Sequence, residues 1–376
     1  MMKRFTKICL RVFTIVILLY IFLVSISLMS HSFKCFGKDF SEKLITTTAN
    51  PIVGLFIGVL ATSIIQSSST TTSMVVGFVA GGALSIRCAI PIVMGANIGT
   101  TVTNTLVAVG HITRKEEFRR AFTSSTMHDL FNMLTVIILL PIELSTHFLE
   151  RTSIHIASLL SNTAGFKATS PIKEIVKPIV EGIDHLFVDQ MGIAIKAAGV
   201  IMLIISFVIL IIALAGLVKI MKDTIAGQSE ILFDKILAKS GMVAMMLGCG
   251  FTAIVQSSSV TTSILVPLVG AGVLRPETVY PIVLGANLGT TITAILASLT
   301  GNVAALTVAI VHVLFNLCGI ILFYPIKFMR AIPITLAKKL GKVVSEKRWV
   351  AIVYVISVFF LLPFILIFLN NVFNKG

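Results

Sequence analysis

The stretch Gln-Ser-Ser-Ser occupies residues 66–69 and returns unchanged at residues 256–259, a shift of 190 positions. A second pair has the same shift: Gly-Ala-Asn-Ile-Gly-Thr-Thr at residues 95–101 and Gly-Ala-Asn-Leu-Gly-Thr-Thr at residues 285–291. Both pairs lie inside long apolar sequence. Neutral polar clusters that are duplicated in this way are typical of a membrane carrier whose solute site lies between two homologous halves.

A third echo, shifted by 184 positions, extends each copy towards the C-terminus. His-Asp-Leu-Phe-Asn at residues 128–132 corresponds to His-Val-Leu-Phe-Asn at residues 312–316. A Pro-Ile pair closes each copy, at residues 141–142 and 325–326. The duplicated unit therefore contains two polar clusters and a further apolar segment with its own His and Asn.

The composition is that of a membrane protein. Of the 376 residues, 56% are hydrophobic and 12% are charged, about half the charged fraction of a soluble protein. Apolar segments long enough for membrane helices recur along the chain, so the bilayer defines its core. Basic loops on one side of the membrane then explain the net charge of +14, and we expect no nucleic-acid partner.

Two apolar segments, residues 50–80 and 240–270, carry a Gln-Ser-Ser-Ser cluster at their centre. A single spanning helix would place this cluster at the middle of the bilayer. Two short helices that meet there fit better, because non-helical backbone is tolerated in a membrane where protein buries it or where it lines a cavity. We therefore predict two re-entrant hairpins, each of which enters and leaves on one side.

The segments 88–110 and 278–300 are predicted to be broken transmembrane helices. Each contains a proline and two glycines ahead of its Thr-Thr pair, and these residues weaken a helix. Gly95 and Gly99 also form a G-x-x-x-G pattern, which permits close helix packing. Packing alone does not explain an Asn and paired Thr in both copies, so we expect a polar break in mid-membrane.

The predicted fold is an all-α polytopic membrane protein with two inverted-topology repeats, each containing a re-entrant helical hairpin and a broken transmembrane helix. Repeat 1 covers residues 46–142 (hairpin 50–80, broken helix 88–110, helix 121–142), and repeat 2 covers residues 240–326 (hairpin 240–270, broken helix 278–300, helix 303–325). The other predicted parts are an N-terminal membrane helix with an exterior loop (1–45), an exterior linker (143–190), a linking membrane helix with a cytoplasmic loop (191–239), and a basic cytoplasmic segment with a C-terminal membrane helix (327–376).

The distribution of Lys and Arg predicts a cytoplasmic N-terminus in the plasma (inner) membrane. With seven full spans and two hairpins, the segments on the N-terminal side carry 19 basic residues and those on the opposite side carry 7. The first hairpin then opens to the outside and the second to the inside, which makes the repeats inverted copies. A cleaved signal peptide is the alternative for residues 1–30, but their apolar run is longer than a usual signal core.

The serine clusters offer ligands for an anion and for a small cation. Each hydroxyl donates one hydrogen bond and accepts up to two, and Gln adds a carbonyl oxygen and an amide. Free N–H groups at a helix N-terminus favour an anion. Freed backbone carbonyls and side-chain oxygens can hold a hard cation such as Na+. A hairpin tip with this composition therefore suits an oxyanion and Na+ close together.

Acidic and basic residues are almost absent from these segments. No Asp or Glu occurs between residues 51 and 110, and Glu277 is the only one between residues 240 and 300. Proton-coupled carriers usually hold an ionisable group inside the membrane. Neither cluster contains Lys or Arg, and an unpaired anion is costly to bury. Bound cations are the expected counter-charge, which predicts cation-coupled anion symport.

The paired motifs resemble the sodium/phosphate cotransporter family of the type II kind. The resemblance is carried by both Gln-Ser-Ser-Ser motifs, both Gly-Ala-Asn-x-Gly-Thr-Thr motifs, the His-x-x-Phe-Asn echoes and Arg-Arg-Ala-Phe at residues 119–122, and it covers roughly residues 45–142 and 238–330. It implies import of inorganic phosphate driven by the Na+ gradient, with both hairpins on a mobile unit beside a scaffold. We expect a bacterial-type member without the soluble C-terminal regulatory domain of some relatives.

Carried over by position, the resemblance gives the candidate site. For phosphate it implies Ser67, Ser68, Ser257 and Ser258. For sodium it implies two environments, Gln66, Ser69, Asn97, Thr100 and Thr101 in repeat 1, and Gln256, Ser259, Asn287, Thr290 and Thr291 in repeat 2. No cofactor and no transition metal is expected, Na+ being the co-transported ion. The oligomeric state, monomer or homodimer, stays open.

Several residues have a structural interpretation that we prefer. We expect His128 and His312 to be packing histidines that hydrogen-bond the helix break of their own repeat. Arg87 is interpreted as a snorkelling interfacial residue in preference to an anion attractor. The five cysteines are scattered and suggest neither a disulfide framework nor a metal site. No Gly-x-Ser-x-Gly motif is present, so an enzymatic role has no support.

Two rival functions follow from the same residues. A carrier of this fold could transport another small anion, such as sulfate or a carboxylate, and competition with phosphate uptake separates this case. An anion channel would show flux without coupling, whereas a symporter accumulates its solute above equilibrium when a Na+ gradient is applied.

Overall fold

The computed structural model describes residues 2–37, 42, 45–46, 48–163, 171–225 and 240–373, and these residues form helices without a strand. The first half contributes α1 (Met2–Phe36), α3 (Pro51–Ile65), α4 (Ser68–Ala80), α5 (Ile86–Gly99), α6 (Val102–Val109), α7 (Lys115–Thr146), α8 (Phe148–Thr163) and α9 (Pro171–His185), which a single π-helical turn, η1 (Leu186–Gln190), extends. The second half contributes α10 (Ile195–Ile225), α12 (Gly241–Val255), α13 (Ser258–Gly270), α14 (Pro276–Gly289), α15 (Thr291–Ser298), α16 (Val303–Phe323), α17 (Lys327–Glu346), α18 (Trp349–Ile356), η2 (Ser357–Leu361) and α19 (Leu362–Phe373).

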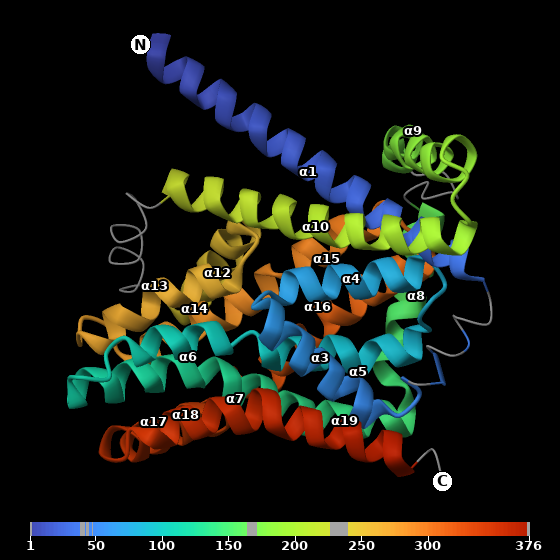
Figure 1. The fold of residues 1–376 in the computed structure, drawn as a ribbon. Coiled ribbons are helices and arrows are strands. Elements are labelled where there is room, and N and C mark those ends of the chain that lie inside the picture. Colours follow the sequence, from blue (N-terminus) through green and yellow to red (C-terminus); the bar gives the residue numbers. More distant parts are fainter. Residues whose placement is uncertain are drawn as a thin grey trace.

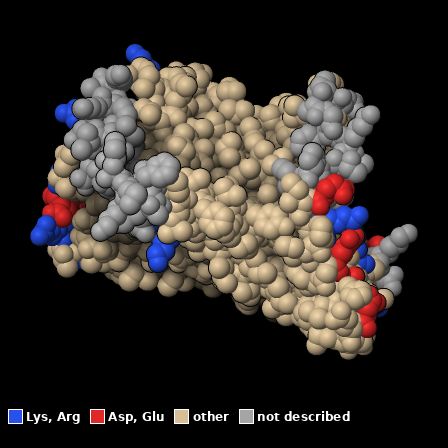
Figure 2. Space-filling model, turned by 90° about the horizontal axis from the view of Figure 1, so that it is seen from above, with Lys and Arg blue, Asp and Glu red and all other residues tan. Residues whose placement is uncertain are grey.

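Seven stretches of the described chain are long and apolar enough to cross a membrane, in the positions of the seven predicted full spans. They are Cys9–Phe36, Ile86–Val109, Lys115–Thr146, Ile195–Ile220, Pro276–Ser298, Val303–Phe323 and Trp349–Asn370. Figure 2 shows charged side chains near the two ends of the visible face and a broad uncharged band between them. Because charged groups avoid hydrocarbon, this band is the part that the bilayer surrounds.

Two pairs of shorter apolar helices, α3 with α4 and α12 with α13, contain the Gln-Ser-Ser-Ser stretches. In each pair the first helix has 15 residues and the second has 13. At about 1.5 Å per residue these helices are roughly 20 Å long, whereas the hydrocarbon core is about 30 Å thick. No member of either pair is long enough to cross a bilayer by itself.

Each Gly-Ala-Asn-x-Gly-Thr-Thr stretch ends one helix and begins the next. Helices α5 and α14 continue through Pro91 and Pro281 and end at Gly99 and Gly289. The short helices α6 and α15 then continue in the same span. The interruption therefore lies at the Thr-Thr pair and not at the proline.

Close packing also uses the glycines of this stretch. A Cβ atom on Gly95 would run into the carbonyl oxygen of Leu55 in α3, and one on Gly285 would run into the carbonyl oxygen of Met245 in α12. Each broken helix thus lies directly against the first helix of its own pair. The G-x-x-x-G pattern therefore serves close helix packing, and the same stretch also contains the helix break.

The second helix of each pair packs on the other repeat. Helix α4 contacts α15 and α16, and helix α13 contacts α6 and α7. Figure 1 shows the pairs approaching the middle of the molecule from opposite ends, since the turn after α4 lies at the right and the turn after α13 at the left. The second helix of each pair is thus exchanged between the repeats, and this exchanged packing brings both Gln-Ser-Ser-Ser turns to the interior.

Helices outside the repeats flank this centre. Helices α1 and α10 pack along each other on one side, while α17, α18 and α19 lie on the opposite side (Figure 1). Two separate helices, α8 and α9, occupy the described part of the predicted linker 143–190. The described chain begins at the left end, with α1, and finishes at the right end, with α19, as an odd number of spans requires.

Candidate functional site

The two Gln-Ser-Ser-Ser stretches form turns of the same local geometry. Gln66 and Gln256 end α3 and α12 in the left-handed region, with φ of 57° and 61°. Ser67 and Ser257 follow in extended conformation, with φ/ψ of −149°/105° and −153°/111°. Because residues other than Gly rarely adopt the left-handed region, its occurrence at both glutamines indicates that both turns meet the same constraint.

Ser67 and Ser257 each N-cap the second helix of their pair. Ser67 Oγ accepts a hydrogen bond from the N–H of Thr70 at 3.2 Å, and Ser257 Oγ accepts one from the N–H of Val260 at 3.4 Å. The cap satisfies one first-turn N–H group, while the others have no partner within the helix. These N–H groups and the positive end of the helix dipole make each turn suitable for an anion.

The two turns meet each other directly. The hydroxyl of Ser69 donates a hydrogen bond to the backbone carbonyl of Gln256 at 3.1 Å. The side chains of the second and third serines of both stretches, Ser68, Ser69, Ser258 and Ser259, are at most 8% exposed. The two turns therefore meet in one region where these four serines are buried, while Ser67 and Ser257 are half-buried.

The two glutamines differ although their backbones match. Gln256 is buried, and its Oε1 accepts a hydrogen bond from Thr293 Oγ1 at 2.8 Å. Its Nε2 donates to the carbonyl of Ala253 at 3.1 Å. Gln66 is exposed, and within the described residues its side chain makes no hydrogen bond. Only the glutamine of repeat 2 is thus fixed against its broken helix.

The histidines hydrogen-bond the helix break of the opposite repeat, so the expected pairing within one repeat is wrong. His128 Nε2 lies 2.9 Å from Asn287 Oδ1, and His312 Nε2 lies 3.3 Å from Asn97 Oδ1. Because an amide oxygen only accepts, both imidazoles donate through Nε2. The exchange of partners follows from the exchanged packing of the repeats.

Two further asparagines extend this contact into a network. Asn132 donates to the carbonyl of Asn97 at 3.0 Å, and Asn287 Nδ2 donates to the side-chain oxygens of Asn132 and Asn316 at 2.8 and 2.6 Å. All members are at most 2% exposed. The predicted sodium ligands Asn97 and Asn287 therefore belong to a buried hydrogen-bond network that joins the repeats.

The four threonines at the helix breaks are buried and hydrogen-bond backbone carbonyls three or four residues back. Thr100 and Thr101 donate to the carbonyls of Ala96 and Ile98, at 3.1 and 3.0 Å. Thr290 and Thr291 donate to the carbonyls of Asn287 and Leu288, at 2.6 and 2.7 Å. Each hydroxyl oxygen keeps lone pairs that can accept or coordinate.

Asn104, a buried residue of α6, was not predicted as part of the site. Its Oδ1 accepts hydrogen bonds from Thr262 Oγ1 at 2.7 Å and Ser263 Oγ at 3.3 Å, so it holds α13 from the other repeat. The corresponding position of repeat 2, shifted by 190, is Ala294. A search for duplicated residues does not detect Asn104, whose only signal in the sequence is a second amide inside an apolar span.

Asp129 was missed for the same reason. Its counterpart in repeat 2, shifted by 184, is Val313. The carboxylate is fully buried in α7 and accepts a hydrogen bond from the hydroxyl of Tyr354 in α18. Its Oδ1 atom has no hydrogen-bond partner in the described chain. A buried carboxylate with a free oxygen is a strong candidate for holding a cation.

Charged clusters elsewhere have structural partners. Arg87 pairs with Glu150 at 3.2 Å, a contact that was not predicted. Glu143, His147 and Glu150 lie close enough to hold a metal ion, but the Glu143 oxygens accept hydrogen bonds from the backbone of α8. A second such group, His31, Cys35 and Asp184, joins α1 to α9 at the periphery. Neither group belongs to the region of the serines.

Comparisons with known proteins agree with these features. The sequence matches the family described as Na+/Pi-cotransporter over residues 21–161 and 209–337. It is 36% identical to "Sodium-dependent phosphate transport protein 2B" of Pongo abelii, over 92% of this chain and 63% of that protein, and the protein of the same name from Homo sapiens gives the same values. It is 34% identical to "Sodium-dependent phosphate transport protein 2A" of Rattus norvegicus, over 92% of this chain and 65% of that protein.

The chain spans less than two thirds of the length of these curated relatives. No solved structure matches it.

Proposed function

Because the chain belongs to the Na+/Pi-cotransporter family, we propose that it is a symporter that imports inorganic phosphate with Na+ across the plasma membrane. The names of its relatives, sodium-dependent phosphate transport proteins 2A and 2B, support both substrates. The observation that carries the proposal is the meeting of the two serine-capped helix N-termini, joined by the hydrogen bond from Ser69 to Gln256.

Phosphate is proposed to bind between these two turns. Ser67, Ser68, Ser257 and Ser258 would supply hydroxyl and backbone N–H donors from both sides, and two helix dipoles would direct their positive ends at one anion. No Lys or Arg occurs in residues 50–80 or 240–270, so the donors are neutral. The remaining charge of the phosphate then needs cations bound nearby.

Sodium is proposed to bind to the oxygens around the helix breaks. In repeat 1 these belong to Gln66, Ser69, Asn97, Thr100 and Thr101, and in repeat 2 to Gln256, Ser259, Asn287, Thr290 and Thr291. Asp129 adds one buried carboxyl group to repeat 1, where repeat 2 has Val313. The two sodium environments are therefore proposed to differ in charge, which favours occupation of the one beside Asp129.

Alternating access is proposed to follow from two re-entrant hairpins in inverted repeats. The short helix pairs would open to opposite faces, with the N-terminus in the cytoplasm as the basic loops indicate. The exchanged packing, in which α4 lies on repeat 2 and α13 on repeat 1, supports a site between the repeats. A relative movement of the repeats would then expose this site to either side in turn.

Uptake of radiolabelled phosphate into proteoliposomes tests the proposal. With an inward Na+ gradient we expect accumulation above equilibrium, and with K+ or choline in place of Na+ we expect none. Competition by sulfate or carboxylates would instead indicate another anion as substrate. Equal flux with every cation would exclude a symporter and leave the channel alternative.

Removing one hydroxyl from either turn tests the site. Ser67→Ala and Ser257→Ala each remove a helix cap and a donor to the anion, and we expect the KM for phosphate to rise about tenfold or more. Ser145→Ala is the control, because this exposed serine bonds only carbonyls of its own helix. Wild-type phosphate dependence in both tip variants would refute the assigned site.

A further inference from the structure

A cavity lies where α12, α14 and α17 come together, outside the region of the serines. Its volume is about 450 Å³. Gly241 and Ala244 of α12, Glu277 and Pro281 of α14, and the first three turns of α17 line it. Helix α14 begins its span at Pro276 and α16 ends its span at Phe323, so the cavity lies at the edge of the membrane.

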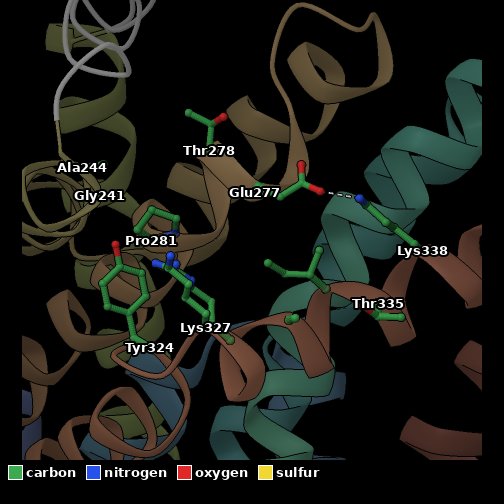
Figure 3. A pocket seen from close by; sticks show the side chains of 12 residues that line it. Gly241, Ala244, Glu277, Thr278, Pro281, Tyr324, Lys327, Thr335 and Lys338 are labelled. Atoms are coloured by element: carbon green, nitrogen blue, oxygen red, sulfur yellow. Dashed lines mark hydrogen bonds and ion pairs between the residues drawn. The ribbon is translucent and has the colours of Figure 1, made fainter.

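The charge of this cavity is positive. Lys327, Arg330 and Lys338 line it with one acidic residue, Glu277, which leaves a formal charge of +2. Glu277 pairs with Lys338, and the dashed line in Figure 3 marks this pair on one side of the cavity. Within the described chain no carboxylate lies within 4 Å of Lys327 or Arg330. Among the described residues, these two cations thus face the cavity without a counter-charge.

An aromatic side chain holds one of these cations in place. The Arg330 guanidinium lies over the ring of Tyr324, 5.1 Å from its centroid. The tyrosine in turn packs its hydroxyl end on Gly241, where a Cβ atom would have no room. Figure 3 shows Tyr324 and Lys327 together on the side of the cavity opposite Lys338. Arg330 is therefore pre-positioned, which lowers the entropy cost of binding an anion.

Exposed apolar residues stand next to Lys327 in the sequence. Ile326 and Phe328 flank Lys327 in the sequence and are 58% and 75% exposed. Exposed large apolar side chains next to basic residues are typical of a helix that lies in the membrane interface. A ligand with a phosphate group and acyl chains would place the phosphate among the basic residues and the chains beside Ile326 and Phe328.

We propose that this cavity binds the phosphate group of an anionic phospholipid headgroup. Lys327 and Arg330 bind the phosphate oxygens, Arg330 through two parallel N–H donors, and Tyr324 offers its hydroxyl beside them. Thr278 at the start of α14 adds a further hydroxyl to the wall. The site is independent of the proposed transport, because none of its residues belongs to the serine turns or the helix breaks.

Binding of a soluble short-chain phosphatidylglycerol to the purified full chain tests the site. We expect native mass spectrometry to show one retained lipid, with phosphatidylcholine of the same chain length retained at least about tenfold less tightly. The double variant Lys327→Gln/Arg330→Gln should lose about tenfold or more in affinity for phosphatidylglycerol. The control Lys339→Gln/Lys342→Gln removes two exposed charges from the same helix outside the cavity and should bind as the wild type does.

A second variant keeps the test decisive if the double variant does not fold. Ala331→Glu adds a carboxylate at an exposed position of the cavity wall on α17, where Glu suits a helix. It should weaken binding about tenfold through like-charge repulsion. Unchanged binding in Ala331→Glu, an equal loss in the Lys339/Lys342 control, or equal retention of phosphatidylcholine would each overturn the proposal.

Millimolar inorganic phosphate distinguishes the two sources of the phosphate group. If it does not displace the lipid, the ligand is the headgroup. If inorganic phosphate displaces the lipid and itself binds more weakly to the double variant, the same residues bind free phosphate. The cavity is then a phosphate site as proposed, but its ligand is the free ion and not the lipid headgroup.

Discussion

At the scale of single residues, neutral side chains make the polar contacts around the serines and the helix breaks, and Asp129 is the ionisable carboxyl group beside them. In the His–Asn network that joins the repeats, His128 and His312 each donate to an amide oxygen, and burial away from a counter-charge disfavours charged imidazoles. Asp129 is fully buried, the hydroxyl of Tyr354 hydrogen-bonds it, and the side chain of Thr101 at the helix break lies beside it. An ionised carboxylate is costly to bury without a positive partner, so we expect Asp129 to bind a cation, and Na+ is the cation in the description of this family.

We expect Asp129→Asn to weaken the Na+ dependence of phosphate uptake. The amide keeps the shape of the carboxylate and can still accept from Tyr354, but it removes the charge that attracts the ion. The Na+ concentration for half-maximal uptake should rise about tenfold or more, since a charged ligand contributes about 1.5–3 kcal/mol.

Tyr354→Phe is the matched control for this change. It removes the neighbouring hydroxyl and leaves the carboxylate charged, so half-maximal uptake should shift much less than in Asp129→Asn. A Na+ titration that matches the wild type in Asp129→Asn would show that this carboxylate does not hold the ion.

At the scale of elements, each broken helix is fixed to the first helix of its own pair through glycine. The carbonyl of Leu55 fills the space above Gly95, and the carbonyl of Met245 fills the space above Gly285. Backbone cannot move aside as a side chain can, so neither glycine tolerates a larger residue. This contact positions Asn97 and Asn287 two residues later in the same helices.

Gly95→Ala and Gly285→Ala should therefore each destabilise the protein by about 3 kcal/mol or prevent folding, since overpacking against backbone cannot be relieved locally. Gly250→Ala is the control, because nothing lies within 4 Å of a Cβ there and Ala favours a helix. Thermal unfolding in detergent, followed by size-exclusion chromatography, measures the effect. Equal midpoints for all three variants would refute the close contact.

At the scale of the whole molecule, the two repeats exchange partners around the centre. Helix α4 packs on α15 and α16, helix α13 packs on α6 and α7, and the turns that follow them face opposite ends of the molecule (Figure 1). An exchange of this kind lets a movement of one repeat change contacts at both serine turns. The proposed inverted orientation of the repeats in the membrane is compatible with this arrangement, and labelling can test it.

We expect Arg87→Cys and Arg275→Cys to label from opposite sides of the membrane. Both residues are exposed and follow the second helix of their pair, and the five native cysteines would be replaced first. A membrane-impermeant maleimide should label Arg87→Cys in intact cells and Arg275→Cys only in inverted vesicles. Labelling of both positions from one side would show that the repeats are not inverted.

The sequence was enough to predict an all-helical membrane protein. It also predicted that residues 66–69 meet residues 256–259, because the two polar clusters are duplicated at one spacing inside apolar sequence. Hydrophobic length alone also located the seven spans, since the bilayer fixes the length of a spanning helix.

Only the tertiary structure decided which polar groups meet. His128 contacts Asn287 and not Asn97, because the helices exchange partners between repeats, and spacing along one chain carries no information about that exchange. Asn104 and Asp129 have apolar counterparts in repeat 2, so duplication did not mark them, and their burial against Thr262 and Tyr354 becomes visible only when the helices pack.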